Sequence, residues 1–250
     1  MTGAFDLPQP LGFPNCSACP YVYNGSPAVC SGCAAQTMRP LAEHHCGICS
    51  QSLSAAGAEC GNPICNWPPE RRYFSRVDAL ALFAHPLKGP VKEFKYDEGK
   101  QGWAVIFGRL IVGWMNDHAD EMADIDLVIG NPSAPARKPL QHIETIMLVA
   151  HSEDATDRWP IAAPGNPALV KLRETPKSAG GGVRWGEKMD AARAHAAALH
   201  LRQSVRGKHI LLFDDVFTTG ATFHTVGKLL TEAGAAEVRG LVLARVPFGS

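Results

Sequence analysis

The segment that decides the fold is residues 209–222, with the sequence HILLFDDVFTTGAT. Its first five residues form a short, mostly apolar run of the kind that fills a buried strand. Two acids, Asp214 and Asp215, follow directly, and small hydroxyl-bearing residues then lead into an apolar-periodic stretch, residues 219–233, which is closed by Gly234. The segment therefore predicts a strand, a turn and a helix, in that order.

The residues at the predicted turn point to a phosphorylated sugar as ligand. In an open parallel sheet, ligands bind at the carboxyl ends of the strands. Two adjacent carboxylates are costly to bury there without partners, and they accept hydrogen bonds well from the vicinal hydroxyls of a ribose. Gly220 allows close backbone approach, and the free N–H groups of a helix N-terminus attract a phosphate.

An ordinary helix cap is the competing interpretation, and it would explain Thr218 or Thr219 but not both acids. A Walker A loop is excluded because no Gly-Lys-Ser/Thr follows. We therefore expect a ribose 5-phosphate site after this strand.

The rest of the chain favours an α/β fold built on a parallel sheet. Further strands are expected at residues 78–83, 125–129 and 238–244, and further helices at residues 102–118, 140–151 and 187–203. The β-branched residues of 140–151 leave a strand open as an alternative there. Pro86 and Gly89-Pro90 are expected to mark turns. Strands that alternate with helices in this way predict a parallel sheet with crossover helices.

Length and composition agree with a folded protein of one large or two small domains. The chain has 250 residues, is 46% hydrophobic and carries no formal net charge. The longest apolar stretch, residues 103–115, is interrupted by Gly108 and Arg109 and is too short to cross a bilayer. No Lys or Arg precedes an apolar run within residues 1–15, so no secretory signal is expected. We expect a cytoplasmic protein that has no membrane partner.

All eight cysteines lie near the start of the chain and form four pairs. Three of the pairs have a two-residue gap, which lets both thiolates of a tight turn reach one metal ion. Four pairs therefore predict two structural Zn²⁺ sites; a disulfide framework is the alternative, and it suits secreted chains. The predicted ligands are Cys16, Cys19, Cys30, Cys33, Cys46, Cys49, Cys60 and Cys65.

The pairing of these cysteines has two possible forms. Sequential ribbons would join the first pair with the second and the third with the fourth, whereas a cross-brace would interleave them. The short gaps between pairs favour the sequential form. Closed four-thiolate sites leave no open position for chemistry and carry a formal charge of about −2 each.

Charge argues against nucleic acid as the partner of the ribbons. Residues 1–70 contain one basic residue, Arg39, and four acidic residues. Because affinity for DNA depends on Lys and Arg that neutralise phosphates, these ribbons are not expected to bind nucleic acid directly. A structural role, or the docking of a protein partner, is expected instead.

The prolines at Pro68 and Pro69 predict a domain boundary. Residues 1–69 would be a double zinc ribbon and residues 70–250 an α/β domain with a separate core. Within the second domain, residues 171–208 hold nine basic and three acidic residues. Such a stretch is either a solvated basic helix or a polyanion site, and the acidic turn that follows it favours the polyanion site.

Residues 211–222 resemble the phosphoribosyl pyrophosphate (PRPP) motif of type I phosphoribosyltransferases. The whole chain resembles the ComF family, in which a double zinc ribbon precedes such a domain. Further stretches that fit the family are Trp67-Pro68-Pro69, Gly89-Pro90-Val91, Lys95-Tyr96, the Arg173-to-Pro176 stretch and the Val205-to-Lys208 stretch.

The resemblance implies an activity and a set of site residues. Asp214 and Asp215 would hold the ribose hydroxyls, Gly130 and Asn131 would form a pyrophosphate loop, and Mg²⁺ would bridge ribose and pyrophosphate. Catalytic roles would fall to Asp214, Asp215, Arg173 and Lys177. PRPP would be bound by Asp214, Asp215, Val216, Phe217, Thr218, Thr219, Gly220, Ala221, Thr222, Gly130 and Asn131.

The implied function is transfer or removal of a phosphoribosyl group on a nitrogenous base. One departure bears on turnover: the family commonly has a Gln soon after Arg-x-Thr-Pro, whereas this chain has Lys177-Ser178 and then a run of three glycines after Ala179. The alternatives are a non-catalytic sensor of PRPP or a nucleotide, and a ComF-type partner of a DNA-uptake or helicase machinery that docks through its ribbons.

Overall fold

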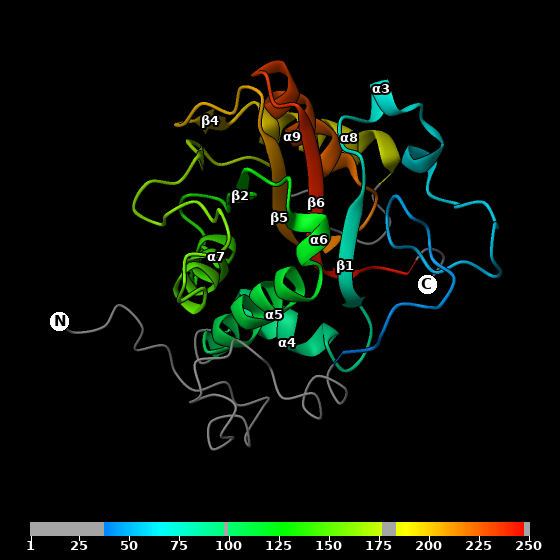
Figure 1. Ribbon diagram of the computed structural model, residues 1–250, viewed down its shortest axis with the longest axis horizontal. Coiled ribbons are helices and arrows are strands. Elements are labelled where there is room, and N and C mark those ends of the chain that lie inside the picture. The colour runs from blue at the N-terminus through cyan, green and yellow to red at the C-terminus, as the bar shows by residue number, and fades with distance from the viewer. Residues whose placement is uncertain (1–37, 98–99, 177–183, 248–250) are drawn as a thin grey trace.

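The computed structural model describes residues 38–97, 100–176 and 184–247. A four-stranded sheet lies at its centre, in the order β1-β6-β5-β2, and every neighbouring pair is parallel (Figure 1). Its strands are β1 (Val77–Leu82), β2 (Leu127–Gly130), β5 (His209–Phe217) and β6 (Glu237–Arg245). β3 (Leu169–Lys171) and β4 (Leu199–Leu201) form a separate antiparallel pair. The predicted parallel-sheet α/β fold is therefore confirmed.

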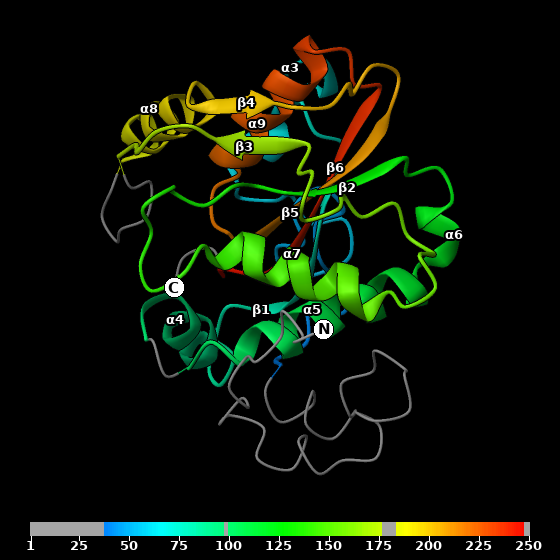
Figure 2. The ribbon, with the colours of Figure 1, turned by 90° about the vertical axis from the view of Figure 1, so that its left-hand side faces the viewer.

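Helices cover both faces of the sheet. Figure 2 shows α8 and α9 on one side and α4, α5 and α7 on the other. The helices are α3 (Pro69–Arg72), α4 (Lys88–Tyr96), α5 (Trp103–Asp117), α6 (Ala119–Met122), α7 (His142–Glu153), α8 (Trp185–Ala196) and α9 (Ala221–Glu232), with the 3₁₀ helix η1 (Pro63–Asn66). None of the helices in the described ranges has the length and apolar character that crossing a membrane requires.

Strand alternation divides the core into two layers. Leu211 and Phe213 of β5 belong to the cluster beneath α4, α5 and α7. Ile210 and Leu212 belong to the cluster on the other face, beneath α9. Because successive side chains point to opposite faces, an apolar run of this kind fits a strand that is covered on both sides. β5 lies between β6 and β2, so its carboxyl end opens at the middle of the sheet.

Two predictions need correction: the turn expected at Gly89-Pro90 and the end of the helix expected over residues 187–203. Gly89-Pro90, expected to mark a turn, lies in the first turn of α4. Proline is tolerated there because the first N–H groups of a helix have no partner within the helix. The helix expected over residues 187–203 ends at Ala196, because residues 199–201 pair with β3 instead. For residues 140–151 the structure has helix, not strand.

The described part of the cysteine-rich segment shares the core of the α/β fold. Cys46, Cys49, Cys60 and Ile64 belong to the same buried cluster as Phe217 and residues of β1 and β6. The backbone of this segment also bonds to β1 where the two lie side by side (Figure 1): the Val77 N–H donates to the Ile48 carbonyl at 2.8 Å. The expectation of separate cores is therefore wrong for residues 38–66, which lie against the sheet.

Candidate functional site

The two acids lie near the carboxyl end of β5, just before the β5–α9 loop. β5 continues past the predicted end at Phe213 to Phe217, so Asp214 and Asp215 are strand residues. Asp214 stands opposite Val242 of β6 in the register. Adjacent strand residues point to different faces, and the two acids accordingly contact different elements.

Asp215 is buried and paired with two basic side chains. Lys95 of α4 forms an ion pair with its Oδ2, and His142 Nε2, at the start of α7, lies 2.7 Å from the same atom. Burial alone would raise the pKa of Asp215, but the positive charge of Lys95 and the hydrogen bond from His142 hold it below its usual range. Asp215 is therefore held as a carboxylate, and its two contacts offset the free-energy cost of burying its charge.

The contacts of Asp215 continue to a serine. A carboxylate only accepts hydrogen bonds, so His142 donates from Nε2 and its Nδ1 accepts from the Ser133 hydroxyl at 2.9 Å. The same hydroxyl oxygen accepts the Ile143 N–H at 3.2 Å. Burial lowers the pKa of His142, although Asp215 opposes this shift.

Asp214 is half-buried and belongs to a second network. Its Oδ2 accepts from Asn131 Nδ2 at 3.0 Å, and its Oδ1 accepts the Asp215 N–H at 2.9 Å. On its other side, Asn131 Oδ1 accepts from His195 Nε2 of α8 at 2.7 Å. Burial and the neighbouring charge of Asp215 raise the pKa of Asp214 to about 7.

His195 is the outer member of this second network. Burial and the charge of Lys171 lower its pKa to about 4, so the imidazole is neutral at neutral pH. Two adjacent acids thus have opposite properties: Asp215 is held ionised, whereas Asp214 changes charge near neutral pH.

The loop after β5 is shaped by Gly220, whose φ is 87°. A Cβ at this position would lie 2.8 Å from the Phe217 ring and 3.1 Å from Ile64 Cγ2, so the loop packs tightly on both side chains. Within the described residues, the backbone N–H groups of 218–222 donate no hydrogen bond to the chain. They are the open donors of a helix N-terminus, which favour an anion.

The end of β2 reaches the site through Gly130 and Asn131. The Asn131 N–H donates to the Phe213 carbonyl at 2.8 Å, which fixes the turn beside Asp214. A Cβ at Gly130 would lie 2.6 Å from Ile143, so glycine lets α7 pack closely against the strand. A cavity of about 300 Å³ adjoins this end of the sheet; among its lining residues are Gly130, Ser133, Glu144 and Lys171.

The described part of the structure does not bring Arg173 or Lys177, the two residues expected to contact pyrophosphate, to Asp214 and Asp215. Arg173 is exposed, and its guanidinium donates to the Ala197 carbonyl at 3.2 Å. Lys177 lies outside the described residues, as does the glycine run that follows it.

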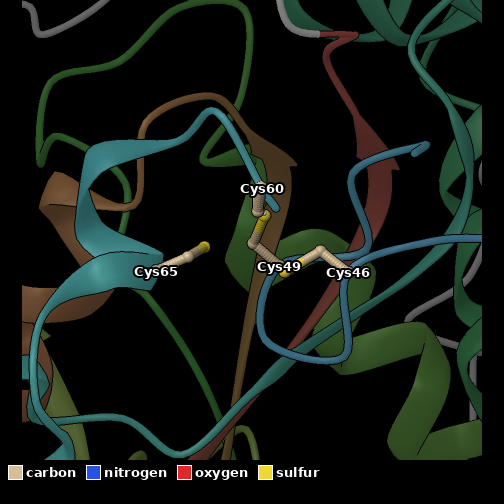
Figure 3. Close-up of side chains that lie close together, drawn as sticks. All are labelled: Cys46, Cys49, Cys60 and Cys65. Carbon is tan, nitrogen blue, oxygen red and sulfur yellow. Dashed lines mark hydrogen bonds between the residues drawn. The ribbon is translucent and has the colours of Figure 1, made fainter. Parts of the chain in front are cut away.

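Four cysteines converge on one point, as Figure 3 shows: Cys46 and Cys49 come from one turn, Cys60 and Cys65 from the segment around η1. Their sulfur atoms all lie within 4.8 Å of one another, and the Cys49 and Cys60 sulfurs are 3.7 Å apart. A tetrahedral site with metal–sulfur bonds of about 2.3 Å has edges of about 3.8 Å. The four thiols could therefore hold a zinc ion.

This grouping joins the third cysteine pair with the fourth, as the sequential scheme predicts. The Ile48 N–H also donates to Cys46 Sγ at 3.4 Å, an interaction that favours the thiolate form. The other four predicted ligands, Cys16, Cys19, Cys30 and Cys33, lie outside the described residues.

Sequence reasoning missed several residues that the structure brings to the site: Lys95, Ser133, His142, His195 and Arg245. Lys95 stood in a stretch that fitted the family but had no role assigned. Arg245 carried a usable indication, because a charged residue directly after an apolar strand must find a partner. The two histidines had none, since each is an isolated residue on a helix.

Comparison with known proteins gives three similarities. Residues 172–249 match the family model described as a phosphoribosyl transferase domain. A curated relative, competence protein ComFC of Streptococcus pneumoniae, is 58% identical over 38 residues, which are 15% of this chain and 17% of the relative. The crystal structure of phosphoribosylpyrophosphate synthetase from Mycobacterium smegmatis has a TM-score of 0.29 and 21% identity, covering 53% of this chain and 33% of that one.

Residues 172–249 thus match a phosphoribosyl transferase domain, and they belong to a chain with a parallel-sheet α/β fold. With the four-cysteine cluster in the N-terminal region, the matches are consistent with a ComF-type protein. Because the aligned segment is a small share of the curated relative, the activity and partners of that protein remain proposals for this chain.

Proposed function

We propose that the chain binds PRPP with Mg²⁺ at the carboxyl end of β5 and transfers the phosphoribosyl group to or from a nitrogenous base. The observation that carries this proposal is the sequence of two acids, a tight loop and a helix N-terminus at the middle of a parallel sheet. Asp214 and Asp215 would hold the ribose hydroxyls. The N–H groups of the loop would hold the 5-phosphate.

The remaining proposed residues surround the pyrophosphate. Gly130 and Asn131 would form the pyrophosphate loop, with Arg173 and Lys177 contributing positive charge. When bound, Mg²⁺ would supply positive charge that stabilises the leaving pyrophosphate. The ionised Asp215 orients the sugar, and Asp214, whose pKa is raised to about 7, can both accept a hydroxyl hydrogen bond and exchange a proton at neutral pH.

The acceptor would bind beside β2. The cavity there is lined by segments between residues 129 and 171, and it combines apolar walls with the polar side chains of Ser133, Glu144 and Lys171. A pocket of this composition suits a flat heterocycle whose edge makes a few hydrogen bonds.

Calorimetric titration of the full chain with PRPP and Mg²⁺ tests binding. Asp214→Asn should weaken it strongly, because an amide cannot replace a carboxylate toward two hydroxyl donors. Asp190→Asn is the matched control, since Asp190 is an exposed acid whose ion pair, among the described residues, is with Arg193. Equal affinities for the two variants would contradict the proposal.

Release of pyrophosphate on adding a panel of bases separates a transferase from a sensor. A sensor would bind PRPP without releasing pyrophosphate with any base. The departure at Lys177-Ser178 from the family's usual loop supports this second candidate.

Structural zinc is the proposed role of the cysteines, with one ion in the described cluster and a second held by Cys16, Cys19, Cys30 and Cys33. Metal analysis of the purified chain tests this, and two zinc ions per chain are expected. A protein partner that docks through the ribbons, in DNA uptake or with a helicase, is proposed from the competence name of the relative. Co-purification that is lost when residues 1–37 are deleted would support it.

A further inference from the structure

Arg245, the last residue of β6, is 1% exposed. None of the carboxylates in the described part of the chain forms an ion pair with it. Its guanidinium is held by backbone carbonyls, and it lies 4.8 Å from the centre of the Phe217 ring. A buried charge without a counterion is costly, so the contacts that this residue makes must hold it firmly.

Apart from the carbonyl of the next residue, Val246, to which Nη1 also donates, the partners of Arg245 fall into two groups. The first is the cysteine cluster: Nε donates to the Cys49 carbonyl at 2.9 Å, and Nη2 lies 3.8 Å from Cys49 Sγ. The second is the start of the β5–α9 loop: Nη1 donates to the Thr218 carbonyl at 2.9 Å and lies 3.4 Å from the Phe217 carbonyl. One side chain therefore joins the cysteine cluster to the loop.

This arrangement fixes the direction of the open donors of the loop. In a trans peptide the C=O and N–H groups point to opposite sides. With the Thr218 carbonyl turned inward to Arg245, the Thr219 N–H of the same peptide plane points away from the core. The Phe217 carbonyl is also bonded, by the Val246 N–H at 2.9 Å, and this orients the Thr218 N–H in the same way.

A second contact joins the cluster to the loop. Ile64, which is fully buried, lies on η1 between Cys60 and Cys65. Its Cγ2 lies 3.1 Å from the point that a Cβ of Gly220 would occupy. The side chain of Ile64, which lies between two of the predicted metal ligands in the sequence, is thus part of the surface on which the glycine of the loop rests.

Charge gives the cluster a reason to hold Arg245. Four thiolates around a divalent ion carry a formal charge of about −2. That charge would lie beside the guanidinium when a metal is bound, and the metal–sulfur bonds would also fix the turn whose Cys49 carbonyl accepts from Arg245 Nε. Without the metal that turn loses this constraint, and the position of Arg245 and of the Thr218 carbonyl that it holds is less firmly set.

We propose that Arg245 is a positioning residue that couples the Cys46–Cys49–Cys60–Cys65 metal site to the phosphate loop, so that metal occupancy and affinity for a phosphorylated ribose depend on each other. The inference rests on the proposed function, since it concerns the same loop. It assigns the cysteine cluster a role in ligand affinity in addition to stability.

The test is a linkage experiment on the full chain. Affinity for ribose 5-phosphate, and for PRPP with Mg²⁺, is measured by calorimetry before and after zinc is removed by a chelator and the chelator is dialysed away. Zinc affinity is measured by chelator competition with and without ribose 5-phosphate. If the two sites are coupled, zinc must change the affinity for ribose 5-phosphate by the same factor by which ribose 5-phosphate changes the affinity for zinc. We expect a factor of about ten, the effect of losing one hydrogen bond to a charged group.

Variants identify the residue that carries the coupling. Arg245→Met should weaken ribose 5-phosphate binding about tenfold in the zinc-loaded chain and bring the linkage factor close to one. Arg245→Lys keeps the charge but cannot reach both groups of carbonyls, so it should be intermediate. Arg239→Met is the control: it lies on the same strand, but its partners are the carboxylates of Asp124 and Glu237.

A spectroscopic measurement separates positioning from loss of stability. Cobalt(II) in place of zinc gives a visible absorption that depends on the geometry at the sulfurs. Ribose 5-phosphate should shift that absorption in the wild-type chain and in Arg239→Met, but not in Arg245→Met. If Arg245→Met does not fold, Arg245→Lys decides by the same two readouts.

The outcomes distinguish the two levels of the proposal. Wild-type protein that binds neither ribose 5-phosphate nor PRPP overturns the proposed function and this inference together. Binding that is equal in zinc-loaded and folded zinc-free protein, or equal in wild type and the Arg245 variants, overturns the coupling alone.

Discussion

His142 Nε2 lies 2.7 Å from Asp215 Oδ2, and this contact joins the start of α7 to the end of β5. With Lys95 on the same oxygen, it holds one of the two adjacent acids as a buried ion. Within the part of the chain that the structure describes, no cationic side chain forms an ion pair with Asp214, which is bonded by Asn131 instead. The two acids therefore differ in what they contribute: Asp215 is held in place by its surroundings, and Asp214 titrates.

The first prediction concerns ligand affinity and pH. Burial and the charge of Asp215 raise the pKa of Asp214 to about 7, and only the ionised form accepts from ribose hydroxyls without competing as a donor. Affinity for ribose 5-phosphate should rise as the pH passes upward through about 7. Titrations across this range test it. Asp214→Asn should lose this rise, and a wild-type profile that is flat there would contradict it.

A second prediction follows for stability. The pKa of Asp214 is higher in the folded chain than its ordinary value of 3.8, so the folded state binds more protons between these two pH values. Its contribution to stability is therefore full at low pH and is lost as the pH rises to about 7. The difference in unfolding free energy between wild type and Asp214→Asn, from urea titrations, should fall across this interval.

The third prediction is that Asp215→Asn destabilises the fold. Removing one partner of a buried ion pair leaves Lys95 without its counterion, at a cost of about 3 kcal/mol. Urea unfolding measures the loss. Asp190→Asn, on the surface, should change the unfolding free energy by less than about 0.5 kcal/mol. If Asp215→Asn also changed the unfolding free energy by less than about 0.5 kcal/mol, the contacts of Asp215 with Lys95 and His142 would contribute little to stability.

Gly220→Ala should disturb the loop from within. The φ of 87° costs a non-glycine residue about 1 kcal/mol, and the new Cβ would meet Phe217 at 2.8 Å. We expect a loss of stability of about 2 kcal/mol, together with weaker binding of ribose 5-phosphate. Gly113→Ala is the control: nothing lies within 4 Å of its Cβ position in α5, so stability should rise by up to about 1 kcal/mol. Thermal unfolding of the two variants compares them.

The sequence predicts those elements of the fold that are determined by residues close together in the chain. The segment from β5 to α9 combines an apolar run, a glycine turn and a helical period in consecutive residues, and its strand and helix are both found, although β5 continues past its predicted end at Phe213 to Phe217. α4 was missed because Pro90 is compatible with a turn and with a first helical turn alike. The end of α8 was misplaced because alanine favours helix, and only the pairing of β4 with β3 overrides that preference.

For the site, the acids could be located from the sequence but their environments could not. Lys95 and His142 approach Asp215 only because α4 and α7 pack on the same face of the sheet, and no periodicity in the sequence encodes that contact. The shared core is a similar case. Cysteine spacing predicts which thiols could hold a metal, but it does not indicate that Ile64 packs beneath Gly220.

The shared core leads to the last prediction, on metal removal. If the cysteine segment were an independent unit, stripping the metal would unfold it and leave the α/β fold melting as before. Cys46, Cys49 and Cys60 instead lie in the cluster that contains Phe217, and Arg245 bonds to Cys49 from β6. Loss of the metal, or Cys49→Ser, should therefore lower the melting temperature of the α/β fold itself.

Differential scanning calorimetry of zinc-loaded and zinc-free protein measures this effect. The described residues should melt in one transition in both forms, at a lower temperature without zinc, because buried contacts cross between the cysteine segment and the sheet. Near-ultraviolet circular dichroism gives a second readout, since Trp67 belongs to the side chains packed on the shared core. A zinc-free chain whose main transition stays at the zinc-loaded temperature would show that the sheet does not depend on the cysteine cluster.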